Sequence, residues 1–264
     1  MLELIASTIT LTIISGVIVG FFLGVFGGGG SVLAAPLLLY LVNVDDPHIA
    51  IGTSAAGVAV IALINLAGHW SAGRVKWPCA LAFGFSGLIG SIAGSSLAKI
   101  TQGEVLLIGF SGAMAMIALS MFRKPHTYGN PDVSLTPTLT MKLIPVGLVV
   151  GMAAGFFGIG GGFLIVPGLM LATGMTMANA TASSLVSVAI FGAATSSNYA
   201  ISGLVKFELV LFMLVGGAIG GALGILTSKR LTQHAQLARK LFASMILIVA
   251  IGVAYQGIQD LIAI

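Results

Sequence analysis

The scarcity of charged residues constrains this chain more than any other feature of its sequence. Only 7% of the 264 residues are Asp, Glu, Lys or Arg, whereas a soluble domain carries about 25%. Two long runs, residues 4–44 and 143–205, contain none of these four residues. A helix needs about 20 apolar residues to cross a membrane, so each run can hold more than one membrane segment. The sequence therefore predicts an all-α, polytopic integral membrane protein, with the lipid bilayer as its main solvent.

An internal repeat divides the chain into two units. The first copy, GVIVGFFLGVFGGGGSVLAAP, starts at Gly16, and the second, GLVVGMAAGFFGIGGGFLIVP, starts at Gly147. The match resumes further along, where the sequence GRVKW at residues 73–77 aligns with GLVKF at residues 203–207. Such self-similarity is typical of transporters built from structural repeats. We expect two homologous membrane repeats, residues 1–122 and 142–264, joined by a connecting cytoplasmic loop at residues 123–141.

Each unit contains five apolar segments, and the second of the five is short. Thirteen helical residues rise about 20 Å, which is less than the bilayer core of about 30 Å. In chain order the expected segments are residues 4–26, 31–43, 48–70, 78–98 and 104–122, and then 142–157, 162–173, 177–200, 207–227 and 240–262.

The distribution of Lys and Arg tests how many of these segments cross the membrane. If all ten cross, nine of the 11 basic residues lie on one face, and only Lys99 and Lys206 lie on the other. If the short segments do not cross, the split is six to five, which is no bias. Basic residues accumulate on the cytoplasmic face. The sequence thus predicts two inverted repeats with both termini in the periplasm. The count is the same if the first two segments of each unit form a hairpin, so hairpin tips and full crossings both stay open.

Glycine-rich breaks interrupt the apolar run at the same place in both units, Gly27–Ser31 and Gly158–Gly162. Non-helical backbone at membrane depth is tolerated only inside protein or beside a water-filled cavity. A helix that restarts after such a break presents free N–H groups to an anion. Close helix packing through small residues is the alternative interpretation. Hairpin tips would bring the two breaks together from opposite faces, so we expect them to hold a substrate anion near the bilayer midplane.

Small polar side chains also correspond between the units. The sequence GTS at residues 52–54 aligns with ASS at residues 182–184, and Asn65 aligns with Thr195. Such groups bond the oxygens of a substrate, or they bond other helices and their own backbone. The predicted substrate-binding residues are Gly27, Gly28, Gly29, Gly30, Ser31, Thr53, Ser54, Asn65, Gly158, Gly160, Gly161, Gly162, Ser183, Ser184 and Thr195.

Other features have plainer interpretations. The spacing of Gly87, Gly90 and Gly94 predicts helix packing, either between the two units or between protomers, which leaves a homodimer open. His69, at the end of the third segment, is expected at the membrane interface. No buried Asp or Glu is evident within a segment, which argues against a cation-coupled pump with acidic ligands.

Neither a nucleotide-binding signature nor a metal cluster accompanies these features. The glycine run is not followed by Lys and Ser or Thr, as a phosphate-binding loop would require. No credible nucleophile–base pair is present, and the net charge of +4 reports membrane topology rather than affinity for nucleic acid. We expect a protein that is not an enzyme and that uses no cofactor.

The sequence resembles the TauE/SafE sulfite exporter family, also called the toluene sulfonate uptake permease family. The motifs that carry the resemblance are GVFGGGGSVLAAP at residues 24–36, GTS at residues 52–54, and GFFGIGGGFLIVP at residues 155–167. The resemblance covers essentially the whole chain and implies a multi-pass permease of the bacterial inner membrane for sulfite, organosulfonates or related anions. We expect a secondary transporter that exports such anions by alternating access. A proton-coupled importer of organic anions and an anion channel are the alternatives.

Overall fold

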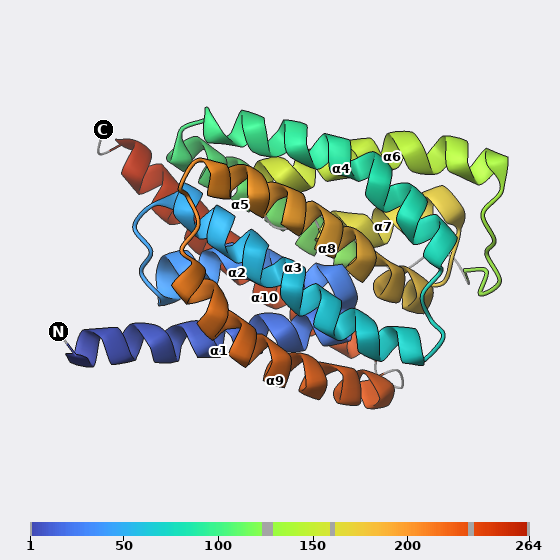
Figure 1. The fold of residues 1–264 in the computed structure, drawn as a ribbon, viewed down its shortest axis with the longest axis horizontal. Helices are drawn as coiled ribbons and strands as arrows, with labels where there is room; N and C mark the ends of the chain where they lie inside the picture. The colour runs from blue at the N-terminus through green and yellow to red at the C-terminus, as the bar shows by residue number, and fades with distance from the viewer. Residues whose placement is uncertain (1, 123–128, 159–161, 232–234, 263–264) are drawn as a thin grey trace.

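The computed structural model describes residues 2–122, 129–158, 162–231 and 235–262, and these residues form a bundle of packed helices without a β-strand (Figure 1). The elements are α1 (Leu2–Phe26), η1 (Gly27–Leu33), α2 (Ala34–Pro36), η2 (Leu37–Leu41), α3 (Pro47–Ser71), α4 (Trp77–Lys99), α5 (Gly103–Phe122), α6 (Pro137–Phe157), α7 (Gly162–Thr173), α8 (Met177–Ile201), α9 (Phe207–Leu231) and α10 (Ala235–Ile262).

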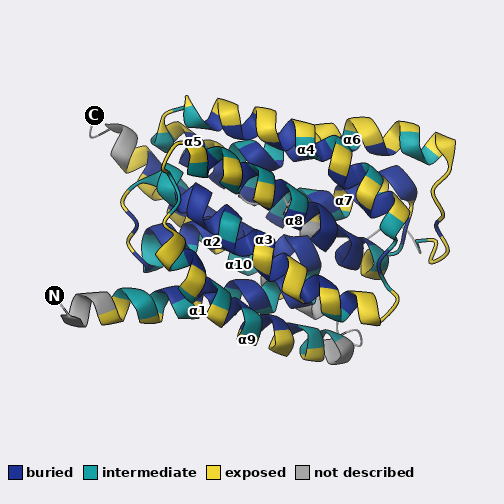
Figure 2. Ribbon diagram, in the orientation of Figure 1, coloured by how far each residue is buried: buried dark blue, intermediate teal, exposed yellow. Residues whose placement is uncertain are grey.

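Seven helical stretches of the described chain are long and apolar enough to cross a membrane, with α1 to η2 counted as one stretch. Exposed residues lie along the outside of the bundle (Figure 2), and many of them are large and apolar. Phe85, Ile89 and Leu211, for example, are each more than half exposed. A surface of this kind suits a lipid solvent and not water. The prediction of an all-α, polytopic membrane protein is confirmed.

The start of α6 differs from the sequence-based expectation for an identifiable reason. Helix α6 begins at Pro137 instead of residue 142, so the end of the expected connecting loop is helical. The Thr136 side chain accepts a hydrogen bond from the Leu139 N–H at 3.3 Å, and Pro137 occupies the first turn, where its missing N–H costs nothing. Polar capping thus extends the helix beyond the apolar run.

The short second segment of the first unit is helical throughout but changes its type twice. It begins at Gly27 as a 3₁₀-helix, passes through one α-helical turn that ends at Pro36, and finishes as a π-helical turn over Leu37–Leu41. Single π-turns inside helices are rare and are frequent at functional sites. The corresponding segment of the second unit is a regular α-helix, α7, with Pro167 inside it.

Glycines allow helices of the two units to pack closely. Gly20 of α1 lies against the backbone of Gly217 in α9, and Gly151 of α6 lies against the backbone of Gly87 in α4. The predicted packing role of the α4 glycines is confirmed, and their partner is the other unit of the same chain. In Figure 1, α4 and α6 run along the top of the bundle, α1 and α9 along the bottom, and α3 and α8 between them.

Helices α3 and α8 run in opposite directions through the centre of the bundle. Gly52 of α3 packs on Tyr199 near the end of α8, whereas Gly192, earlier in α8, packs on Ala55 and Ala59. Helix α10 packs against α5, and α7 lies beside η1. The beginning of α1 and the end of α10 lie at the same end of the bundle, on the left of Figure 1.

Candidate functional site

The first glycine-rich break is a buried turn between α1 and η1. Gly27 has a φ of +61°, a left-handed conformation that favours glycine. A Cβ atom at Gly27 would collide with the carbonyl oxygen of Thr181 in α8. After the turn the chain folds back along α1, so that Gly30 lies against the backbone of Phe22 and Leu23. Glycine is therefore required here by both conformation and space.

A chain of buried hydrogen bonds joins this turn to α8. The Gly28 N–H donates to the Ser184 hydroxyl at 3.0 Å, and that hydroxyl donates to the Thr181 carbonyl at 2.7 Å. The Ser31 hydroxyl donates to the Gly28 carbonyl at 2.8 Å. Gly27–Ser31 and Ser184 are all buried. We call this set of residues, Gly27–Ser31 with Thr181 and Ser184, the first glycine site.

The second glycine-rich break begins with the same geometry. Gly158 ends α6 with a φ of +65°, and its N–H bonds the Gly155 carbonyl at 3.3 Å. A Cβ atom at this position would collide with the Ile51 side chain near the start of α3. Gly160 and Gly161 lie outside the described residues, and Gly162 is the first residue of α7.

The structure does not bring together Gly27 and Gly158, the described first residues of the two glycine breaks. Gly27 lies against Thr181 near the start of α8, whereas Gly158 lies against Ile51, the neighbour of Gly52, which packs on Tyr199 near the end of α8. The α-helical rise of 1.5 Å per residue separates Thr181 from Tyr199 by about 27 Å. The breaks thus lie near opposite ends of the α3–α8 pair, and the expected meeting at the midplane is not what the fold shows.

The paired hydroxyls of α3 and α8 bond the backbone of the opposite unit. The Thr53 hydroxyl accepts from the Lys206 N–H at 3.0 Å, and the Ser183 hydroxyl accepts from the Lys76 N–H at 2.9 Å. Each bond fixes the residue that precedes a helix, α9 in one case and α4 in the other. Ser54 donates to the Ile51 carbonyl of its own helix at 3.0 Å.

Asn65 and Thr195 lie in separate helix interfaces. The Asn65 amide donates to the Ile61 carbonyl at 3.0 Å, and its oxygen lies between Gly24 and Gly221 with no conventional donor among the described residues. The Cα–H groups of glycines at such close approach are weak donors. The Thr195 hydroxyl is 3.4 Å from that of Ser91 in α4. Neither residue contacts the first glycine site through a hydrogen bond between described residues.

One polar contact beside the first glycine site was not predicted from the sequence. His69 is only 3% exposed, and its Nε2 is 3.1 Å from the carbonyl oxygen of Gly24 in the last turn of α1. The expected interfacial position of His69 is therefore only half right, because it lies near the end of α3 but inside the protein. The signal that could have found it is its alignment with Tyr199, which is also buried at the opposite end of the bundle.

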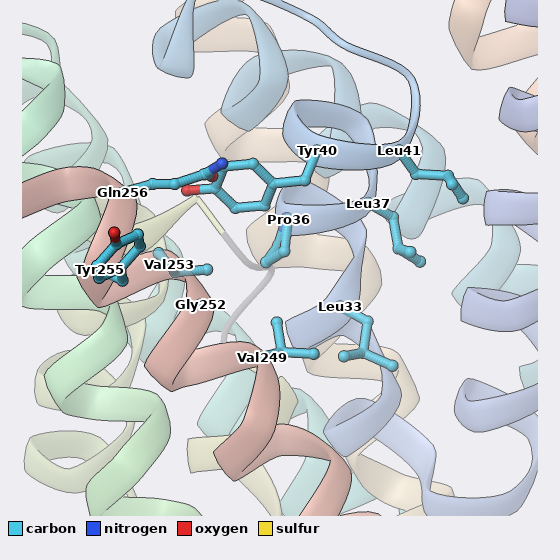
Figure 3. Close-up of a pocket in the computed structure, with 10 residues that line it drawn as sticks. All are labelled: Leu33, Pro36, Leu37, Tyr40, Leu41, Val249, Gly252, Val253, Tyr255 and Gln256. Carbon is cyan, nitrogen blue, oxygen red and sulfur yellow. The ribbon is translucent and has the colours of Figure 1, made fainter. Parts of the chain in front are cut away.

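A crevice of about 460 Å³ opens between the second segment of the first unit, from η1 to η2, and helix α10 (Figure 3). Leu33, Pro36, Leu37 and Val249 make its lining largely apolar, and the side chains of Tyr40 and Gln256 lie at one end of it. A lining of this kind offers little to a small anion, which needs hydrogen-bond donors. The first glycine site is therefore the better candidate.

Comparison with known proteins defines the class to which this fold belongs. A curated protein of Xylella fastidiosa (strain Temecula1), named "Probable membrane transporter protein", is 44% identical over 97% of this chain and 98% of its own length. A Bacillus subtilis protein, "Probable membrane transporter protein YdhB", is 26% identical over 78% of this chain and 85% of its own. No solved structure matches the chain. Together with the helical bundle, these relatives indicate a membrane transporter.

The family is defined by a match over nearly the whole chain. Residues 12–253 match the family described as Sulfite exporter TauE/SafE. The chain belongs to the TauE/SafE family, as the glycine-rich motifs of both units led us to expect.

Proposed function

We propose that the protein is a secondary transporter that exports small anions, sulfite or organosulfonates, across the bacterial inner membrane by alternating access. The observation that carries this proposal is the first glycine site. It contains a backbone N–H and hydroxyl groups at a helix break, buried within a membrane protein. Oxyanions bind such donors at the start of a helix. A buried site is also what a carrier requires in a state closed to both faces.

Two inverted repeats, residues 1–122 and 142–264 around the connecting segment 123–141, provide the framework of this proposal. Reciprocal contacts support the arrangement. Thr53 bonds Lys206 and its counterpart Ser183 bonds Lys76, while Gly20 packs on Gly217 and its counterpart Gly151 packs on Gly87. A two-fold relation between the units would generate such exchanged pairs. We further propose that all ten segments cross and that both termini are periplasmic, which fits their position at one end of the bundle (Figure 1).

Within the first glycine site, the Ser184 hydroxyl occupies the place that an anion oxygen would take. It accepts the Gly28 N–H bond and donates to a carbonyl. A hydroxyl can rotate and become a donor to an anion. An entering oxyanion would then accept bonds from both Gly28 and Ser184. The second break, with Gly158, Gly160, Gly161 and Gly162, is proposed to form an equivalent site near the other end, and not a shared midplane site.

A thermal-shift measurement on the purified protein tests this site. We expect sulfite, but not chloride at equal ionic strength, to raise the melting temperature, because a ligand at 100 times its Kd stabilises the folded state by about 2.7 kcal/mol. Thiosulfate, sulfoacetate, taurine and small carboxylates complete the panel. The substitution Ser184→Ala should reduce the shift strongly. Ser196→Ala is the matched control, because among the described residues its hydroxyl bonds only the Ala193 carbonyl of the same helix. An undiminished shift in Ser184→Ala would contradict the site.

A further inference from the structure

A cluster of polar side chains ties the end of α4 to the end of α8. The Lys99 ammonium group donates three hydrogen bonds, to the Asn198 carbonyl at 3.1 Å, the Asn198 side-chain oxygen at 2.8 Å and the Ser202 hydroxyl at 3.0 Å. The Asn198 amide group in turn donates to Ser95 at 2.7 Å and to Ser96 at 3.0 Å. We call these five residues the Lys99 cluster.

The acceptors that surround Lys99 are all neutral. Each of its three N–H groups has an oxygen partner, so the bonds are charge-assisted and belong to the stronger class of protein hydrogen bonds. Asn198 uses its backbone and both side-chain polar atoms within the cluster. The hydrogen-bonding groups of Lys99 and Asn198 are thus all used within the cluster, which links the end of α4 to the end of α8.

The other unit lacks the polar partners of this cluster at the corresponding positions, although Lys99 itself corresponds to Lys229. In the alignment of the two units, Asn198 corresponds to Gly68 and Ser202 to Ala72, while Ser95 and Ser96 correspond to Ile225 and Leu226. These residues have no side-chain hydrogen-bonding group. The contact between α3 and α9 is apolar there, with Gly68 packed on the Ile225 side chain. The two units, similar elsewhere, therefore differ in the polar side chains that they offer at this contact.

We propose that the Lys99 cluster is a latch that closes the end of the bundle at which α4 and α8 terminate, and that it biases the carrier toward opening at the other end. This inference rests on the proposed alternating-access mechanism. A carrier whose two ends were equally easy to open would populate both open states alike. Five hydrogen bonds join α4 to α8, whereas the corresponding contact between α3 and α9 is apolar at Gly68 and Ile225, and this difference shifts the balance.

Two single-cysteine reporters test the latch without any substrate. Cys79 is the only cysteine of the chain, and Cys79→Ala provides the background. Ala98→Cys places a thiol at a fully buried position next to Lys99, and Ser228→Cys places one at the corresponding position of the other end. The measurement is the rate at which a water-soluble thiol reagent labels each reporter, before and after Asn198→Ala or Lys99→Met is added.

We expect either latch substitution to raise the labelling rate of Ala98→Cys about tenfold, the minimum for a lost hydrogen bond to a charged group. The rate of Ser228→Cys should fall, because opening one end depletes states open at the other. Lys99→Arg should restore slow labelling, and Ser196→Ala should change neither rate. Faster labelling of both reporters would show that the substitution destabilises the whole protein. Unchanged labelling rates would show that the Lys99 cluster does not keep this end closed. Either result overturns the proposal. Labelling does not depend on sulfite, so failure of the proposed substrate would leave this test intact.

Discussion

At the scale of single residues, the left-handed glycines Gly27 and Gly158 mark the points at which α1 and α6 end. The matched positions of Gly27 and Gly158 predict a break in the helix, and both residues have positive φ. Their neighbours, Thr181 and Ile51, could not be predicted, because each contact depends on how α8 or α3 packs. The same holds for Lys99, whose partner Asn198 lies on a helix far along the chain and has no counterpart in the other unit.

Comparing two glycines separates conformational strain from contact at the first glycine site. Gly73 has a φ of +67° and nothing within 4 Å of a built Cβ, whereas Gly27 meets the Thr181 carbonyl. We expect Gly73→Ala to lower the free energy of unfolding by about 1–2 kcal/mol, the cost of the left-handed conformation. Gly27→Ala should cost clearly more. Melting temperatures of the two purified variants measure these losses. Equal losses would show that the collision with α8 adds nothing to the cost of Gly27→Ala.

At the scale of helices, the apolar runs predict the elements well because lipid contact demands long stretches of apolar residues. The ends are less predictable, since capping decides them. Thr136 starts α6 before the apolar run begins. The change from 3₁₀ to α to π geometry after Gly27 also could not be predicted from the sequence. Glycine permits many backbone conformations, and only packing selects one of them.

The hydrogen bonds that fix the starts of α4 and α9 provide a test of how the two units are related. Thr53→Ala and Ser183→Ala each leave a part-buried backbone N–H, of Lys206 or Lys76, without its acceptor. We expect losses of about 1–3 kcal/mol in each case, and of similar size because the bonds are reciprocal. Thr53→Ser, which keeps the hydroxyl, is the control. A loss in only one of the two variants, seen in their melting temperatures, would argue against equivalent roles.

At the scale of the whole molecule, the repeat explains which parts lie near each other and which do not. The expectation that the two glycine breaks meet assumed that each hairpin stops at the midplane. Instead, each break packs near the first turns of a central helix of the other unit, Gly27 on α8 and Gly158 on α3. The antiparallel course of α3 and α8 then places the breaks near opposite ends. No local pattern encodes the depth at which a chain turns, and for this reason the sequence could not show it.

We propose that this TauE/SafE family member carries small anions through a pathway that includes the first glycine site. Sulfite flux into liposomes containing the purified protein tests it most directly. We expect flux down the sulfite gradient that saturates with concentration and needs no pH gradient. The flux should fall at least about tenfold in Ser184→Ala, because a hydrogen bond to a charged ligand is lost, and it should persist in Ser196→Ala. Flux that does not saturate would indicate a channel, and flux that requires a proton gradient would indicate a proton-coupled importer. Flux no greater than in protein-free liposomes would contradict the proposed substrate.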